Sequence, residues 1–258
     1  TGPYRRTGPQ PGFLARLGRD RPSLSQELRL ASASDQRLRW LVGAFGYRED
    51  KEEFAQNPTV VNGVVQAVGK NPDKQIENLA FFGRLEYDIV PTVTASVEGR
   101  HATDELSFAL STGEVTRDFK STTPRVSLSW RPSDDVTYYA SYAKGTRPGD
   151  VNTSLYGPTV PASERDRLSG FVDVDEEETD NYEIGAKAWL LDRKAYVELA
   201  VFDIEWRKQQ LTASQTYTTT ANRPANISLV QNAGKTRIRG SEFSFLWQAL
   251  DSLQLSGS

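Results

Sequence analysis

The stretch "PRVSLSWRPSDDVTYYASYAKGTRPG", residues 124–149, holds two alternating segments on either side of a tight polar turn at 131–135. Strict alternation of apolar and polar residues is typical of a β-strand with two different faces. The residues that can face an apolar environment are Val126, Leu128, Trp130, Tyr138, Ala140 and Tyr142. Those that can face water are Arg125, Ser127, Tyr139, Ser141 and Lys144. The stretch therefore predicts an antiparallel hairpin that continues into a polar loop after 145.

The same alternation recurs along most of the chain, in segments that are long for β-strands. The clearest segments are 77–88, 92–101, 117–130 and 178–190. A tilted strand needs about 9–11 residues to cross a bilayer, whereas strands of ordinary globular proteins average about 5–6 residues. The faces of 195–206 are not assigned, because "VELAVF" is apolar on both sides.

Connections between these segments alternate strictly in length. The short ones lie at 32–36, 88–92, 131–135, 190–194 and 249–252. The long polar ones lie at 48–76, about 102–117, 145–177 and 208–226. In an up-and-down meander, alternate connections share one end of the sheet. We therefore expect tight turns at one end and long loops at the other, as in outer-membrane barrels.

Composition narrows the function classes. The 258 residues include no cysteine and one histidine, with a net charge of −3. Disulfides and thiolate metal sites are excluded, and the acidic balance argues against a nucleic-acid partner. No run approaches the ~20 apolar residues of a membrane helix. A membrane barrel remains compatible with the modest hydrophobic content, since only alternate residues of its strands meet lipid.

A soluble, secreted β-sandwich is the alternative that the pattern leaves open. In that interpretation the domain binds carbohydrate, and Tyr156, Trp206 and Tyr217 provide stacking surfaces. Strand length and the asymmetry of the connections favour the barrel.

Several segments, in order, resemble one family. They are "SQELRLAS" (25–32), "WLVGAFGY" (40–47), "ENLAFFGRLEYDI" (77–89), "TVTASVEGR" (92–100), the hairpin at 124–149, "EETDNYEIGAKAWLLDRKAYVELAVFDIEW" (177–206) and "NAGKTRIRGSEFSF" (232–245). Together they resemble the barrel of TonB-dependent outer-membrane receptors. The resemblance implies an all-β fold: an antiparallel up-and-down meander that forms about ten of an expected 22 transmembrane strands.

We accordingly expect residues 1–24 to be an extracellular loop or irregular lead-in and 25–258 to be a partial barrel. A plug domain, a TonB box and a closing C-terminal strand are not recognised in the chain. The resemblance further implies an outer-membrane transporter rather than an enzyme, without a resident cofactor. Its ligand would be a ferric siderophore or a similar small molecule, its surroundings outer-membrane lipid, and its energy source TonB acting through the plug.

The candidate ligand-binding residues are polar or aromatic residues of the lumen or the loops. They are Arg84, Glu86, Arg100, Arg125, Tyr139, Arg147 and Tyr156. His101 is interpreted as a lone histidine where a strand meets its loop, not as a haem ligand. The acidic run at 173–180 lacks the glycine and the distal glutamate of a calcium loop, so we expect a solvated loop base.

Overall fold

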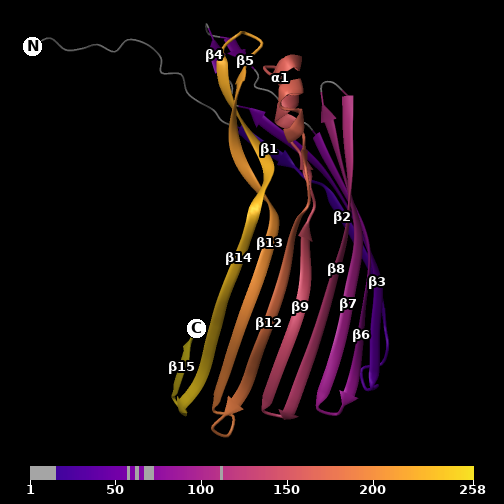
Figure 1. Cartoon of the computed structure of the whole chain (residues 1–258), viewed down its shortest axis with the longest axis vertical. Coiled ribbons are helices and arrows are strands. Elements are labelled where there is room, and N and C mark those ends of the chain that lie inside the picture. The colour runs from indigo at the N-terminus through magenta and orange to yellow at the C-terminus, as the bar shows by residue number, and fades with distance from the viewer. Residues whose placement is uncertain (1–15, 57–58, 62–63, 67–72, 111–112) are drawn as a thin grey trace, which may run out of the picture.

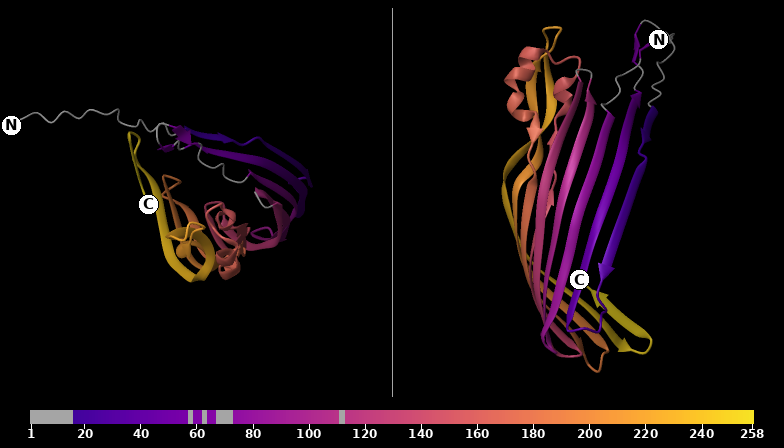
Figure 2. Two further views of the ribbon diagram at one scale, coloured as in Figure 1. Left: turned by 90° about the horizontal axis from the view of Figure 1, so that it is seen from above. Right: turned by 90° about the vertical axis from the view of Figure 1, so that its right-hand side faces the viewer.

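The computed structural model describes residues 16–56, 59–61, 64–66, 73–110 and 113–258. Most of them lie in one curved antiparallel sheet (Figure 1). Its strands are β1 (Arg16–Asp20), β2 (Ser23–Ala31), β3 (Leu38–Gln56), β6 (Asp73–Val90), β7 (Val93–Leu110), β8 (Gly113–Ser133), β9 (Val136–Arg147), β12 (Glu177–Leu190), β13 (Ala195–Thr218), β14 (Pro224–Leu250) and β15 (Leu253–Gly257). Seen from above, the sheet curves into an arc that is open on one side (Figure 2).

Shorter elements occupy the upper connections. They are β4 (Thr59–Val61), β5 (Val64–Gln66), β10 (Asp150–Val151), η1 (Thr153–Tyr156), α1 (Ala162–Arg167), η2 (Ser169–Phe171) and β11 (Asp173–Val174). Within the described ranges, no helix has both the length and the apolar character needed to span a bilayer.

Strand order confirms the predicted meander. Neighbours in the sheet follow the chain from β3 to β15, and every pair is antiparallel. β1 and β2 both pair with β3 and so occupy one position, which leaves ten positions. Strand pairing already begins at Arg16, inside the segment 1–24 that was expected to lead in. The large sheet is a single layer, so the two-layer sandwich interpretation is wrong.

The tight turns all lie at one end, the lower end in Figure 1. They join β2 to β3, β6 to β7, β8 to β9, β12 to β13 and β14 to β15. Each coincides with a predicted short connection. Arg193 and Asp135 join two neighbouring turns by an ion pair of 2.9 Å.

Two predicted long loops are largely strand, and that prediction was wrong. β7 and β8 stay paired up to Leu110 and Gly113, which removes most of the loop expected at 102–117. β13 and β14 stay paired up to Thr218 and Pro224, which shortens the loop expected at 208–226. In 208–226 the Thr- and Ser-rich stretch shows no clear apolar alternation, yet backbone pairing needs none and threonine favours strands. Part of 48–76 lies outside the described residues.

The register confirms the two faces of the hairpin. Leu128 pairs with Ala140 on one side, and Ser127 pairs with Ser141 on the other. The apolar face carries large exposed side chains, including Leu85, Val97, Val126, Leu128 and Ile184. Such exposure suits a face that meets lipid. The expectation for Lys144 was wrong: it shares the face of Tyr142 instead of that of Ser141, and it pairs with Glu178 at 2.9 Å.

A compact cap covers the upper ends of β13 and β14. We define the cap as residues 148–176 together with 209–232. Its core contains Leu155, Val160, Leu168, Tyr217 and Leu229, all buried. The buried side chain of Asn152 attaches the loop to β14: it donates to Val230 O (2.7 Å) and Phe171 O (2.6 Å) and accepts from Val230 N (2.8 Å). The connection 148–176 is therefore folded rather than extended.

Candidate functional site

The polar face of the sheet carries a concentration of arginines on its N-terminal strands. Arg84 of β6 and Arg125 of β8 flank Glu98 of β7 in one row of the register. Arg29 of β2 and the ring of Phe82 complete a hollow of about 470 Å³. We call this hollow the cationic basin. Three arginines and one glutamate line this hollow, so it favours an anion.

Two of the basin arginines have acidic neighbours on their own strands. Arg29 pairs with Glu27, and Arg84 approaches Glu86 at 3.8 Å. Among the described residues, the side chain of Arg125 has no hydrogen bond or ion pair, although its backbone is paired in the sheet. Its N–H groups are therefore available to a ligand. Arginine presents planar, bidentate donors that match carboxylates and similar oxygen pairs.

Arg100 and Glu86 lie on the same face but belong to separate networks. Arg100 donates to Asn78 Oδ1 at 3.0 Å and lies over the ring of Phe45. Glu86 accepts a 3.5 Å hydrogen bond from Arg39, whose stronger partner is Asp88 at 2.6 Å. These two candidates are engaged in holding strands together.

The C-terminal strands carry a second hollow of about 580 Å³, rich in carboxylates, which we call the acidic basin. Tyr139 lines it and donates to Glu183 at 2.7 Å. Lys187 pairs with Glu198 at 2.7 Å, and Glu242 adds a third carboxylate. Gly185 lies beneath the ring of Tyr139, which occupies the space where any Cβ at 185 would lie.

Arg147 and Tyr156 lie far above the two basins. Arg147 ends β9 and pairs with Glu177 at 3.1 Å. Tyr156 packs against the core of the cap, with Arg165 over its ring at 5.7 Å. The seven candidates therefore do not form one site. Arg84 and Arg125 are the pair that the fold brings together around an open hollow.

Two glutamates that lie outside the membrane-crossing part of the strands have shifted side-chain pKa values. The hydrogen bond from Arg167, followed by that from the backbone N–H of Thr218, lowers the pKa of Glu164. Burial, followed by the nearby charges of Glu178 and Asp104, raises the pKa of Glu176. The cap therefore contains one carboxylate whose pKa is lowered and one whose pKa is raised, so the two respond to acidification in opposite ways.

His101 lies in the middle of β7, not at a strand end, so its predicted position was wrong. Its ring nitrogen Nδ1 lies 2.9 Å from Thr122 Oγ1 on the apolar face. The acidic run at 173–180 is dispersed: Asp173 pairs with Arg117 at 2.7 Å, while Glu177 and Asp180 belong to β12. Within the described ranges, no group of three or more His, Asp or Glu side chains is arranged for a metal ion.

Residues 2–258 match the model of the TonB-dependent receptor-like β-barrel family. The chain belongs to this family. Receptors of this family are proteins of the bacterial outer membrane and act as transporters, not as enzymes. In a receptor barrel, the apolar face meets lipid and the polar face lines the lumen. Both basins are therefore hollows of the lumen wall.

Similar proteins include receptors for several metals. The metal-pseudopaline receptor CntO of Pseudomonas aeruginosa strains UCBPP-PA14 and PAO1 is 27% identical over 139 residues, which cover 54% of this chain and 16% of the receptor. The solved copper transporter OprC has a TM-score of 0.68 at 15% identity, covering 91% of this chain and 36% of that chain.

Pyoverdine-bound FpvA of P. aeruginosa has a TM-score of 0.66 at 16% identity, covering 94% of this chain and 32% of that chain. The siderophore receptor PiuA of Acinetobacter baumannii has a TM-score of 0.64 at 17% identity, covering 93% and 38%. The chain thus spans about a sixth of the curated relatives and about a third of these structures. At such identities, the likeness to solved structures shows the fold alone.

Sequence reasoning missed several lumen residues of this receptor barrel. Arg29, Glu183, Lys187, Glu198 and Glu242 line the basins but were not among the candidates. Alternation in 25–32 and 178–190 places the first three on the polar face. Glu198 lies in the segment whose faces could not be assigned, and only its pairing with Lys187 and Ser244 identifies its side.

Proposed function

We propose that this chain forms part of the wall of a TonB-dependent uptake receptor that imports an anionic metal chelate, with a ferric siderophore as the cargo. Membership of the family supports uptake across the outer membrane. CntO, FpvA and PiuA, whose names refer to metal or siderophore ligands, support a metal chelate as the class of cargo. The energy would come from TonB through a plug domain outside these 258 residues.

The cationic basin is the observation that carries the proposal. Arg29, Arg84 and Arg125 line a hollow around Glu98 on the lumen wall. Arg29 and Arg84 have acidic partners in Glu27 and Glu86, so the positive charge offered to a ligand is that of Arg125, whose side chain has no ion pair among the described residues. A low-dielectric wall focuses this field into the lumen and raises the local concentration of anions. A chelate that brings its own metal ligands needs only shape, aromatic surface and charge from the receptor.

A transport assay with the full-length receptor tests this proposal. Cells that have this receptor as their only uptake route are given radioactive iron bound either to an anionic or to a neutral siderophore. Replacing Arg84 and Arg125 together by glutamine should raise the half-saturating concentration of the anionic chelate at least about tenfold, since a single hydrogen bond to a charged group contributes about 1.5–3 kcal/mol. Uptake of the neutral chelate should change little.

Arg193→Gln is the matched control, because Arg193 is exposed at the turn end and outside both basins. Its uptake kinetics should equal those of the native receptor. Equal loss for both chelates would remove the charge argument. Uptake of a copper chelate but not of a ferric one would reject the ferric cargo and retain the metal chelate.

Expression provides a second, independent test of the cargo. The gene for a ferric siderophore receptor should be induced when iron is scarce. Induction by a particular sugar, with no response to iron, would reject the ferric siderophore and leave the barrel fold unaffected.

A further inference from the structure

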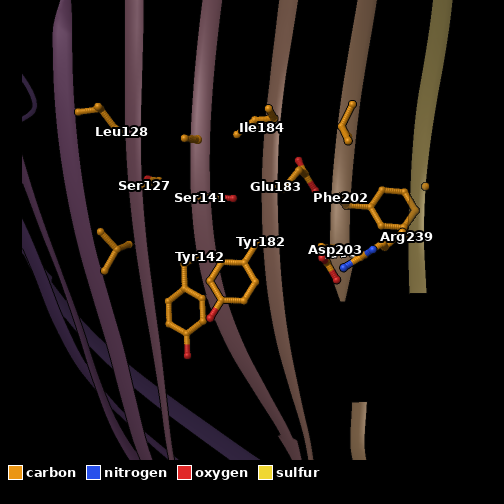
Figure 3. Close-up of a pocket in the computed structure, with 14 residues that line it drawn as sticks. Ser127, Leu128, Ser141, Tyr142, Tyr182, Glu183, Ile184, Phe202, Asp203 and Arg239 are labelled. Carbon is orange, nitrogen blue, oxygen red and sulfur yellow. Dashed lines mark hydrogen bonds and ion pairs between the residues drawn. The ribbon is translucent and has the colours of Figure 1, made fainter. Parts of the chain in front are cut away.

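The lipid-facing side of the sheet contains a groove of about 620 Å³ (Figure 3). Ala140 of β9 forms its floor, because this small side chain is the register partner of both Leu128 and Ile184. Val201 continues the wall on β13 beside Ile184. A short side chain between larger ones leaves a hollow of apolar surface along the strands.

The extracellular end of the groove is bounded by two tyrosines, Tyr142 and Tyr182, and by the Asp203–Arg239 ion pair. Tyr142 and Tyr182 pack with ring centroids 5.0 Å apart, next to Asp203 and Arg239 in the same row of the register (Figure 3). Amphipathic aromatic side chains mark the level of the lipid headgroups. The groove therefore rises from Leu128 and Ala140 in the membrane interior toward the headgroups of the outer leaflet.

The arginines at this end keep most of their hydrogen-bonding capacity. Asp203 accepts from Arg237 Nε (2.8 Å), Arg237 Nη2 (2.6 Å) and Arg239 Nε (3.0 Å). Each guanidinium offers five N–H donors, so one carboxylate engages only a minority of them. The arginine side chains are 54% and 63% exposed. The ion-paired patch around them holds five cations, Lys144, Arg207, Lys235, Arg237 and Arg239, and four carboxylates, Glu178, Asp180, Asp203 and Glu205. One net positive charge therefore remains at headgroup depth.

We propose that this groove binds a phosphate-bearing lipid of the outer leaflet, with one acyl chain over Ala140 and a phosphate on Arg237 and Arg239. The apolar floor suits the chain and the guanidinium forks suit phosphate, which they bind bidentately. The site lies on the opposite side of the wall from both basins. Lipid binding here is therefore independent of the cargo.

Native mass spectrometry of the full-length receptor in detergent tests the proposal. The probes are a doubly phosphorylated lipid A and the same lipid after removal of both phosphates. The native receptor should bind the phosphorylated lipid at least about tenfold more tightly, the equivalent of one charge-assisted hydrogen bond. Arg237→Gln combined with Arg239→Gln should abolish this preference. Inorganic phosphate at millimolar concentration should not displace the lipid.

Ala140→Phe separates the groove from the headgroup contact. A phenyl ring there fills the hollow from the lipid side, so it should weaken binding of both lipids while keeping the preference for phosphate. Arg48→Gln is the matched control, since Arg48 is an exposed arginine of the same face, 55% exposed and paired with Asp50 and Glu77. It should change nothing.

Retained folding is checked by the slower migration of the barrel on a gel after heating. A folded double arginine variant that still prefers the phosphorylated lipid would overturn the proposal. So would a native receptor that binds the two lipids equally. If the double variant does not fold, Arg237→Lys with Arg239→Lys keeps both charges and loses the bidentate forks, and an unchanged preference in that variant would overturn the bidentate contact.

Discussion

We call the part of the sheet whose apolar face carries Leu85, Val97, Leu128, Ile184 and Leu199 the belt. The belt and the cap follow opposite rules of burial within one chain. In the belt, Leu128 is 45% exposed and Leu199 is 50% exposed, while charged residues line the other side of a single layer. In the cap, Leu155 and Leu229 are completely buried. The difference reflects the solvent: exposing a leucine side chain to lipid has little free-energy cost, whereas exposing it to water is unfavourable. Stability in the cap therefore rests on packing, and stability in the belt rests on strand pairing.

The largest contrast should come from leucine truncation. Leu229→Ala removes the centre of the cap core and should lower the free energy of opening of the cap by about 2–5 kcal/mol. Hydrogen exchange of the amides around Leu155 and Leu168 in the full-length receptor measures this. Leu199→Ala, on the lipid-facing side, should leave assembly and exchange nearly unchanged because lipid fills the space. Equal effects at both sites would contradict the comparison.

The next largest effect should come from an arginine placed on the lipid-facing side of the belt. Leu128→Arg sets a guanidinium against lipid at a cost of about 2–4 kcal/mol near the midplane, which is a sizeable part of a stability of ~5–15 kcal/mol. It should reduce the yield of assembled barrel, measured by heat-dependent migration on gels. Nearness to the turn softens the effect.

Ser127→Arg is the control for that substitution, because Ser127 faces the lumen one residue away. It should assemble almost normally. Since the native chain has no cysteine, single probes at 126, 128 and 140 should be quenched by lipid-borne quenchers, and probes at 127 and 141 should not. Equal quenching on both faces would refute the assignment.

Removal of the Asn152 side chain should have a smaller effect, confined to the cap. Asn152→Ala leaves the N–H and C=O of Val230 and the C=O of Phe171 without this partner, at about 1–3 kcal/mol for an unsatisfied buried group. Faster exchange of the Val230 amide is the expected result. Asn226→Ala removes an exposed asparagine of the same strand and should change local stability by less than about 0.5 kcal/mol.

Acidification should produce the smallest effect, and again only in the cap. Because the pKa of Glu164 is depressed below its usual value of 4.5, its ionised form stabilises the cap above that pH. The contribution is lost as pH falls through the depressed folded-state pKa. Protection of the Thr218 amide should decline over this range.

In Glu164→Gln, that decline should be absent. If the variant showed the same pH dependence as the native receptor, another carboxylate would be responsible. Glu176 has a raised pKa and responds with the opposite sign, so its protonation cannot produce the expected loss.

Most of the belt could be predicted because its signals are local. The alternation at 124–142 assigns each face, and the polar turn at 131–135 joins the two strands; both are confirmed by the register. The cap could not be predicted. Its core joins Leu155 and Leu168 to Tyr217 and Leu229, about sixty residues away, and no periodicity in a Thr- and Ser-rich segment announces such a contact.

The candidate site, too, could be predicted only in part from the sequence. Alternation alone places Arg84 and Arg125 on one face, since side chains of a strand point to opposite sides in turn. That they share a row with Glu98, and that Arg29 joins them from β2, depends on the stagger of five strands, β2, β3, β6, β7 and β8. Residues 195–206 are apolar on both sides, so only pairing with β12 and β14 shows that Glu198 faces the lumen.

The sequence by itself determined the strand segments near the tight turns, their two faces and the end at which those turns lie, because each depends on a period of two and on turn residues within a few positions. Tertiary structure alone decided which side chains meet across strands: the two basins, the groove over Ala140 and the cap core. The physical reason is register. A shift of two residues between paired strands keeps both faces but changes every cross-strand neighbour, and alternation within one strand does not distinguish the two alignments.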